Sequence, residues 1–183
     1  MSKLDPHKPS SLTRRELVGG AILAAAATAV GATAALGSMA SPRCGADTHA
    51  RTALRQVVSF DARPAQVYAA LMSSQAFAAF TGMPGTIDPA VGGAFSIFGG
   101  LIVGRNIELA PDRRIVQVWR AVEDFPSGVY SLVKMDLSPT AAGTRLVLDH
   151  TGFPEGHYDH LYEGWPPRYW LPLKRYLHAG TST

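Results

Sequence analysis

The chain has 183 residues, a formal net charge of +3 and one cysteine. With 46% hydrophobic and 17% charged residues, its composition excludes a disordered chain and a collagen-like repeat. Residues 17–42 carry no charge, so we expect an N-terminal leader followed by one domain.

The charge pattern excludes a general affinity for nucleic acid. After the leader the chain is nearly neutral, and its basic residues are scattered rather than gathered in a patch. Such a domain has no global attraction for phosphate backbones. Cys44 is the only cysteine, so no intramolecular disulfide is expected.

The N-terminus has the features of a twin-arginine export signal. Arg14 and Arg15 directly precede a weakly apolar stretch of mainly Ala, Gly and Thr, residues 17–36. Small side chains at Ser38 and Ala40 suit a leader peptidase, which predicts a signal over residues 1–40 and a flexible linker over 41–52. The expected partner is the twin-arginine export machinery, and the expected location is the periplasm or the exterior. The alternative is an uncleaved anchor in the inner membrane.

A domain over residues 53–179 should begin with a strand and two helices. Ala53 to Phe60 has strand character, and Pro64 suits the first turn of a helix. A second short helix from Ser73 to Phe80 ends at the turn residues 82–85.

Period-two alternation, cut by turn residues, predicts five further strands. They are Ala94 to Phe98, Leu101 to Leu109, Arg114 to Ala121, Tyr130 to Leu137, and Thr144 to His150. No helix intervenes, so the strands should pair antiparallel.

Aromatic and aliphatic residues at helical spacing then predict a long C-terminal helix, namely Trp165, Tyr169, Leu173, Tyr176 and Leu177. Pro166 and Pro167 should lie in its first turn, and Pro172 should kink it.

Several short motifs resemble a known family. They are Gly92-Gly93-Ala94-Phe95, Gly104, the strand Arg114 to Arg120, Gly143 to Leu146, and Gly164-Trp165. The resemblance is to activators of Hsp90 ATPase, within the SRPBCC superfamily of START lipid-transfer domains, polyketide cyclases and birch-pollen allergens. It implies an α+β helix-grip fold, in which a curved antiparallel sheet of about six strands wraps around a long C-terminal helix. A cavity is expected between the sheet and that helix.

The cavity-facing residues follow from taking the more apolar side of each strand as inward. This places Val133, Met135 and Leu137 inside, together with Leu146, Leu148 and His150. On the Leu101 to Leu109 strand it places Val103, Arg105, Ile107 and Leu109 inside, and Asn106 and Glu108 outside. The predicted ligand-binding residues are Phe95, Arg105, Gln117, Trp119, Ser131, His150, Trp165 and Tyr169.

Two alternatives to ligand contact stay open at this stage. A β-bulge near Gly104 would turn Arg105 to solvent, and inward Gln or His residues are often satisfied core groups.

The sequence holds no recognisable metal or catalytic site. His157 and His160, with Glu163 nearby, read as surface decoration of a loop before the last helix, because no second local ligand pair completes a metal site. No cofactor is expected. Asp149 and His150 are adjacent on one strand and point to opposite faces, so they cannot cooperate directly.

The predicted function is therefore binding of a small hydrophobic or amphipathic molecule, for example an apolar carboxylate held by Arg105. One alternative is a cyclase-like enzyme in which Arg105 and His150 polarise a bound carbonyl. The other is an interaction module that uses a sheet edge or a helix face to bind another protein.

Overall fold

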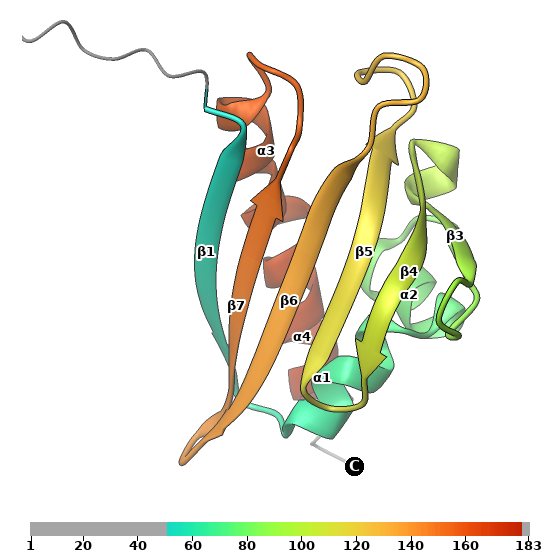
Figure 1. The fold of residues 1–183 in the computed structure, drawn as a ribbon. Helices are drawn as coiled ribbons and strands as arrows, with labels where there is room; N and C mark the ends of the chain where they lie inside the picture. Colours follow the sequence, from blue (N-terminus) through green and yellow to red (C-terminus); the bar gives the residue numbers. More distant parts are fainter. Residues whose placement is uncertain (1–50, 181–183) are drawn as a thin grey trace, which may run out of the picture. The chain divides into compact units, whose positions relative to one another are not determined.

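The computed structural model describes residues 51–180, and the predicted leader lies outside them. In these residues a seven-stranded antiparallel sheet is covered on one face by helices (Figure 1). The spatial order of the strands is β1-β7-β6-β5-β4-β3-β2. None of the helices in residues 51–180 combines the length and the apolar content that crossing a bilayer requires.

The strands and helices follow the predicted order, with one additional strand. In chain order they are β1 (Ala53–Phe60), α1 (Pro64–Leu71), α2 (Ser74–Thr81), β2 (Thr86–Ile87), β3 (Ala94–Ile97), a 3-10 turn (Phe98–Gly100), β4 (Ile102–Ala110), β5 (Arg114–Ala121), β6 (Ser131–Thr140), β7 (Gly143–Thr151), α3 (Tyr158–Trp165), a π-helical turn (Pro166–Trp170) and α4 (Leu171–Gly180). The additional strand is β2, whose two residues are too few to show an alternation.

The two short helices have the predicted ends. Pro64 opens α1, where its missing N–H is harmless. The Ser73 hydroxyl caps α2 by accepting from the Ala76 N–H at 3.2 Å, and Gly82 ends that helix in the left-handed region at φ 70°.

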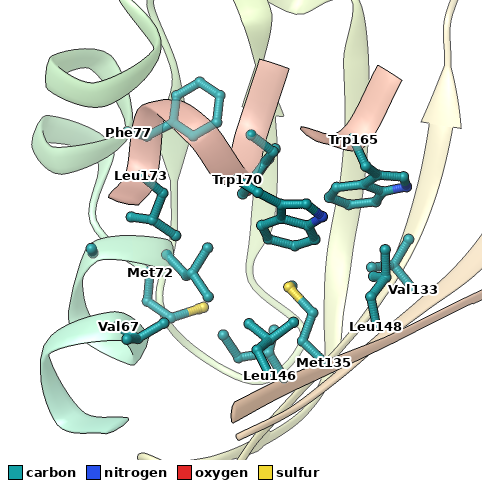
Figure 2. Close-up of a cluster of buried hydrophobic side chains, with 14 of the residues drawn as sticks. Val67, Met72, Phe77, Val133, Met135, Leu146, Leu148, Trp165, Trp170 and Leu173 are labelled. Atoms are coloured by element: carbon teal, nitrogen blue, oxygen red, sulfur yellow. The ribbon is translucent and has the colours of Figure 1, made fainter. Parts of the chain in front are cut away.

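The hydrophobic core lies between the sheet and the helices. Val133, Met135, Leu146 and Leu148 are at most 1% exposed, and Figure 2 shows these side chains directed towards Trp165 and Trp170. The predicted inward faces of β6 and β7 are therefore confirmed.

The predicted phase of β4 is wrong over most of the strand. Asn106 is fully buried opposite Gln117, whereas Arg105 is exposed and Ile107 is 49% exposed. A register shift between Asn106 and Glu108 inserts one extra residue. A β-bulge of this kind reverses the inward and outward alternation, so one phase cannot describe both halves of the strand.

Val103, also predicted inward, lies opposite Arg120 on the outer face of the sheet. Leu109, beyond the bulge, packs against the core as predicted.

The C-terminal helical run starts earlier than predicted. α3 begins at Tyr158, so the segment around His157 and His160 is not a surface loop, and Pro166 and Pro167 lie in the middle of the run. The run departs from α-helical geometry in a π turn that ends directly before α4, where the Leu171 N–H donates to the Pro166 carbonyl. Pro172 then falls in the first turn of α4, which tolerates proline.

The proline pair also ties this run to the sheet. In an α-helix the Tyr162 carbonyl would accept from the N–H of residue 166, but neither Pro166 nor Pro167 has an N–H. The Gln56 amide of β1 donates to that carbonyl at 2.7 Å instead, and its oxygen accepts from Trp170 Nε1 at 2.7 Å.

Candidate functional site

A cavity of about 70 Å³, partly open to solvent, lies where β4, β5 and β6 approach the C-terminal helical run. Aromatic and aliphatic side chains form most of its wall. The lining residues are Phe98, Ile102, Trp119, Ala121, Phe125, Ser131, His150, His160, Leu161, Gly164, Trp165, Arg168 and Tyr169.

Five of the eight predicted site residues line this cavity, namely Trp119, Ser131, His150, Trp165 and Tyr169. Phe95 and Gln117 are buried in the core but do not reach it. Arg105 lies outside, where its Nη1 donates to the Gly92 carbonyl at 3.0 Å. The prediction that Arg105 faces the cavity is wrong because of the bulge in β4.

His150 belongs to a chain of hydrogen bonds. Trp165 Nε1 donates to His150 Nδ1 at 3.3 Å, and His150 Nε2 lies 2.8 Å from the Ser131 hydroxyl. That hydroxyl in turn donates to the Trp119 carbonyl at 3.2 Å. An indole N–H can only donate, so Nδ1 accepts and the proton of the neutral ring lies on Nε2. Burial lowers the pKa of His150 to about 4, which keeps the ring neutral at pH 7.

A second buried chain holds the neighbouring polar groups. Trp119 Nε1 donates to the Gln117 amide oxygen at 2.8 Å, and the Gln117 amide donates to Asn106 at 2.8 Å. Asn106 then donates to the carbonyls of Asp88 and Ala90. These amides are satisfied core groups, so they have no free hydrogen-bonding atom to offer a ligand.

Gly104 explains how Phe95 reaches Trp119. A Cβ atom at this position would collide with the Phe95 ring and with the Val118 carbonyl. The missing side chain lets the Phe95 ring pack edge-on against Trp119, with 5.9 Å between their centroids. Phe95 therefore supports one wall of the cavity from behind.

Tyr169 is the buried cavity residue with an unused polar group. It is 4% exposed and packs on the rings of Trp119 and Trp165. Within residues 51–180 its hydroxyl has no hydrogen-bond partner, yet it is not among the side-chain atoms sealed from solvent. Burial raises the pKa of this phenol, so it stays protonated and can donate.

Two exposed basic side chains, His160 and Arg168, stand at the rim of the cavity. The Arg168 side chain forms no ion pair or hydrogen bond with any residue in the part of the chain that the structure describes. Sequence reasoning missed both residues, because it placed His160 in a loop and considered only the aromatic, aliphatic and proline residues of the C-terminal helix, which left Arg168 out.

Phe98 and Phe125 form the walls beside the rim. Phe98 has a left-handed backbone at φ 53°, which is unusual for a bulky residue, and it packs on Tyr169. Phe125 comes from the loop between β5 and β6, is buried, and lies edge-on to His157 at 5.4 Å. That loop thus covers one side of the cavity.

The other residue groups considered from the sequence are a possible metal site and the pair Asp149 and His150. Within residues 51–180 no group of three or more His, Cys, Asp or Glu side chains lies close enough to hold a metal ion. Asp149 lies on the outer face, 3.2 Å from Lys134, while His150 is buried, so the prediction of opposite faces is confirmed.

A curved antiparallel sheet closed on one face by a C-terminal helical run, with a small cavity beneath, defines a helix-grip domain. The model of the family described as Activator of Hsp90 ATPase homolog 1-like protein matches residues 61–178. The chain belongs to that family.

The relatives are larger proteins that share this one domain. The chain is 27% identical over 125 residues to activator of 90 kDa heat shock protein ATPase homolog 2 of Mus musculus, covering 68% of this chain and 38% of that one. It is 33% identical over 107 residues to the Dictyostelium discoideum homolog, covering 58% of this chain and 28% of that one.

Among solved structures, an Hsp90 activator from Plasmodium falciparum superposes with a TM-score of 0.64 at 22% identity, covering 69% of this chain and 96% of that one. This likeness shows the fold.

Proposed function

We propose that the domain binds a small amphipathic molecule, with its apolar part in the cavity and an anionic head group at Arg168. The observation that carries the proposal is an unpaired guanidinium at the mouth of a cavity walled by aromatic rings. A few polar groups converging on an apolar cavity are the usual form of a small-molecule site. Arg168 takes the role that the sequence predicted for Arg105.

The size of the cavity limits what can enter. Sites for drug-sized ligands measure about 300–1,000 Å³, and an engineered cavity that binds benzene measures about 150 Å³. A cavity of about 70 Å³ admits a short alkyl group or the edge of a ring. The rest of the ligand then lies in the open mouth, beside the exposed Arg168 guanidinium.

The structure gives the enzyme alternative no support of its own. Arg105 and His150 lie on different faces of the sheet, and Nδ1 and Nε2 of His150 both have protein partners. The carbonyl-polarising pair predicted from the sequence is therefore not formed. Binding, rather than turnover, is what the geometry favours.

Matched pairs of ligands test this proposal. Hexanoate is compared with 1-hexanol and phenylacetate with 2-phenylethanol, using intrinsic tryptophan fluorescence, because two of the three tryptophans, Trp119 and Trp165, line the cavity. We expect Arg168→Gln to weaken each carboxylate about tenfold and to leave the alcohols nearly unchanged, because only the carboxylates lose a charge-assisted hydrogen bond.

Arg175→Gln is the matched control, since Arg175 is exposed on α4 and does not line the cavity. It should change neither affinity. Equal losses for acid and alcohol, or no binding of any of the four probes, would contradict the proposal.

We further propose that the protein is exported by the twin-arginine route. Arg14 and Arg15 and the weakly apolar stretch after them support this, although they lie outside the described residues. Export would place the cavity in the periplasm or outside the cell.

A further inference from the structure

The outer face of the sheet, opposite the helices, has two chemically different halves. One half carries a balanced network of ion pairs across five strands. Its contacts are Arg55 to Asp149 at 3.5 Å, Lys134 to Asp149 at 3.2 Å, Lys134 to Asp136 at 3.4 Å, Arg114 to Asp136 at 2.6 Å and Arg114 to Glu108 at 3.4 Å. In these contacts three cations meet three anions, so each of the three carboxylates already has a basic partner.

The other half is apolar with two uncompensated cations. The strand registers place Val103 opposite Arg120 and Val118 opposite both Arg105 and Leu132. Tyr130 directly precedes β6 and is 48% exposed, and Leu132 is 41% exposed. These six residues, Val103, Arg105, Val118, Arg120, Tyr130 and Leu132, are called the outer patch below.

Arg120 is the anomaly in this patch. Its Nε is the one side-chain nitrogen or oxygen in residues 51–180 that is sealed from solvent and has no hydrogen bond. It also has no ion pair there. A buried N–H of a charged group that lacks an acceptor is costly, so such atoms are rare in native proteins. Arg105, the neighbouring cation, donates only to a backbone carbonyl.

We infer that the outer patch docks an acidic segment of another protein, in which an Asp or Glu is flanked by apolar side chains. The carboxylate accepts from the two terminal nitrogens of Arg120, which are not among the atoms sealed from solvent, in the paired geometry that guanidinium groups provide. The flanking apolar side chains cover Val118 and Leu132, which removes water from around the charge pair.

Two other occupants fit less well. A second copy of the patch would bring Arg105 and Arg120 against their own counterparts, and like charges in contact are unfavourable. A nucleic-acid strand would find two cations among apolar side chains, not the row of basic groups that phosphates require. Charge complementarity therefore favours an acidic protein segment.

The test is selection of a random 16-residue peptide library on the full-length protein. Enriched peptides should contain Asp or Glu between aliphatic or aromatic residues. Affinities of the resynthesised peptides, measured by fluorescence polarisation, should fall at least tenfold with Arg120→Gln. Arg120→Lys should also weaken binding, because an ammonium keeps the charge but loses the two parallel donors of the guanidinium.

Four further changes make the result specific. Leu132→Ser should weaken binding, whereas Arg145→Gln, an exposed arginine of β7, should not. Replacing the acidic peptide residue by its amide should cost as much as Arg120→Gln, and the two changes should not add. Arg168→Gln should have no effect, which separates this surface from the cavity.

The inference fails if no peptide is enriched, if enriched peptides lack an acidic residue, or if Arg120→Gln leaves their affinity unchanged. It also fails if sedimentation equilibrium shows a dimer that Leu132→Ser dissociates, because the patch would then bind its own copy. Circular dichroism melts confirm that each variant is folded.

Discussion

The indole N–H of Trp165 donates to Nδ1 of His150 across 3.3 Å, so the C-terminal helical run sets the tautomer of a histidine on β7. Protonating this imidazole would turn Nδ1 into a donor and set two donors against each other. Ser131, Trp119, Phe153 and Trp165 pack around the ring and carry no charge that would stabilise an imidazolium.

Stability should therefore fall as the pH falls from 6.5 to 4. The folded pKa of His150 is lowered to about 4 by burial, against an ordinary value of 6.5, so in this window the unfolded chain binds the extra proton. A difference of this size corresponds to about 3 kcal/mol in the free energy of unfolding. Urea melts at a series of pH values measure it. The contribution of His150 should level off below pH 4, where the lowered pKa of Asp136 causes a separate further loss. His150→Gln should remove the decline between pH 6.5 and 4; an unchanged slope in the variant would show that other groups are responsible.

Gln56→Ala should destabilise the domain by about 1–2 kcal/mol, because it removes both hydrogen bonds and leaves Nε1 of the buried Trp170 without a partner. Arg55→Ala is the control, since that side chain is 66% exposed and its ion pair is weak, so it should cost no more than about 0.5 kcal/mol. Urea melts give the free energy of unfolding of both variants. Equal losses would mean that the contact between β1 and the helical run contributes little.

Phe125→Ala should widen the cavity from the loop side. The buried ring forms one wall, so its removal should improve the affinity for 2-naphthylacetate more than that for hexanoate. Phe80→Ala removes an equally buried ring that does not line the cavity, and it should lower stability by a similar amount without changing ligand preference. Both variants are titrated with 2-naphthylacetate and hexanoate. The same change in ligand preference in Phe80→Ala as in Phe125→Ala would contradict the role of Phe125 as a wall.

Changing both Arg14 and Arg15 to lysine should leave folded protein in the cytoplasm, because the export receptor recognises the guanidinium pair and not charge alone. Cell fractionation measures this. N-terminal sequencing of the exported wild type should begin at Ser41 or a close neighbour. Normal export of the double variant would rule out the twin-arginine route.

The sequence predicted the strands well because their alternation is simple wherever one face is buried. β1 and β5 have the predicted bounds, and Ser131 and His150 were placed inward from side-chain period alone. The prediction for β4 failed because a bulge shifts the alternation by one residue. Gly104 had suggested a bulge that turns Arg105 to solvent, but the register shift lies between Asn106 and Glu108, and the sequence alone does not fix that position. Asn106 reads as a surface residue, yet it is fully buried.

The candidate site was predicted only in part, because it depends on contacts between segments distant in the chain. Arg168 reaches the cavity only because the helical run starts at Tyr158 and passes through a π turn. Phe125 reaches it only through the fold of a loop. Neither position has a local pattern that period or propensity could detect.

The proline pair has a consequence for how this chain could vary during evolution. The Tyr162 carbonyl needs a hydrogen-bond donor from β1 only because residues 166 and 167 have no N–H to donate. Replacing Pro166 by an ordinary residue would let the helix bond to that carbonyl itself, and an amide at position 56 would lose one of its two contacts. Positions 56, 166 and 170 should therefore co-vary among relatives, with the amide, the proline and the tryptophan gained or lost together.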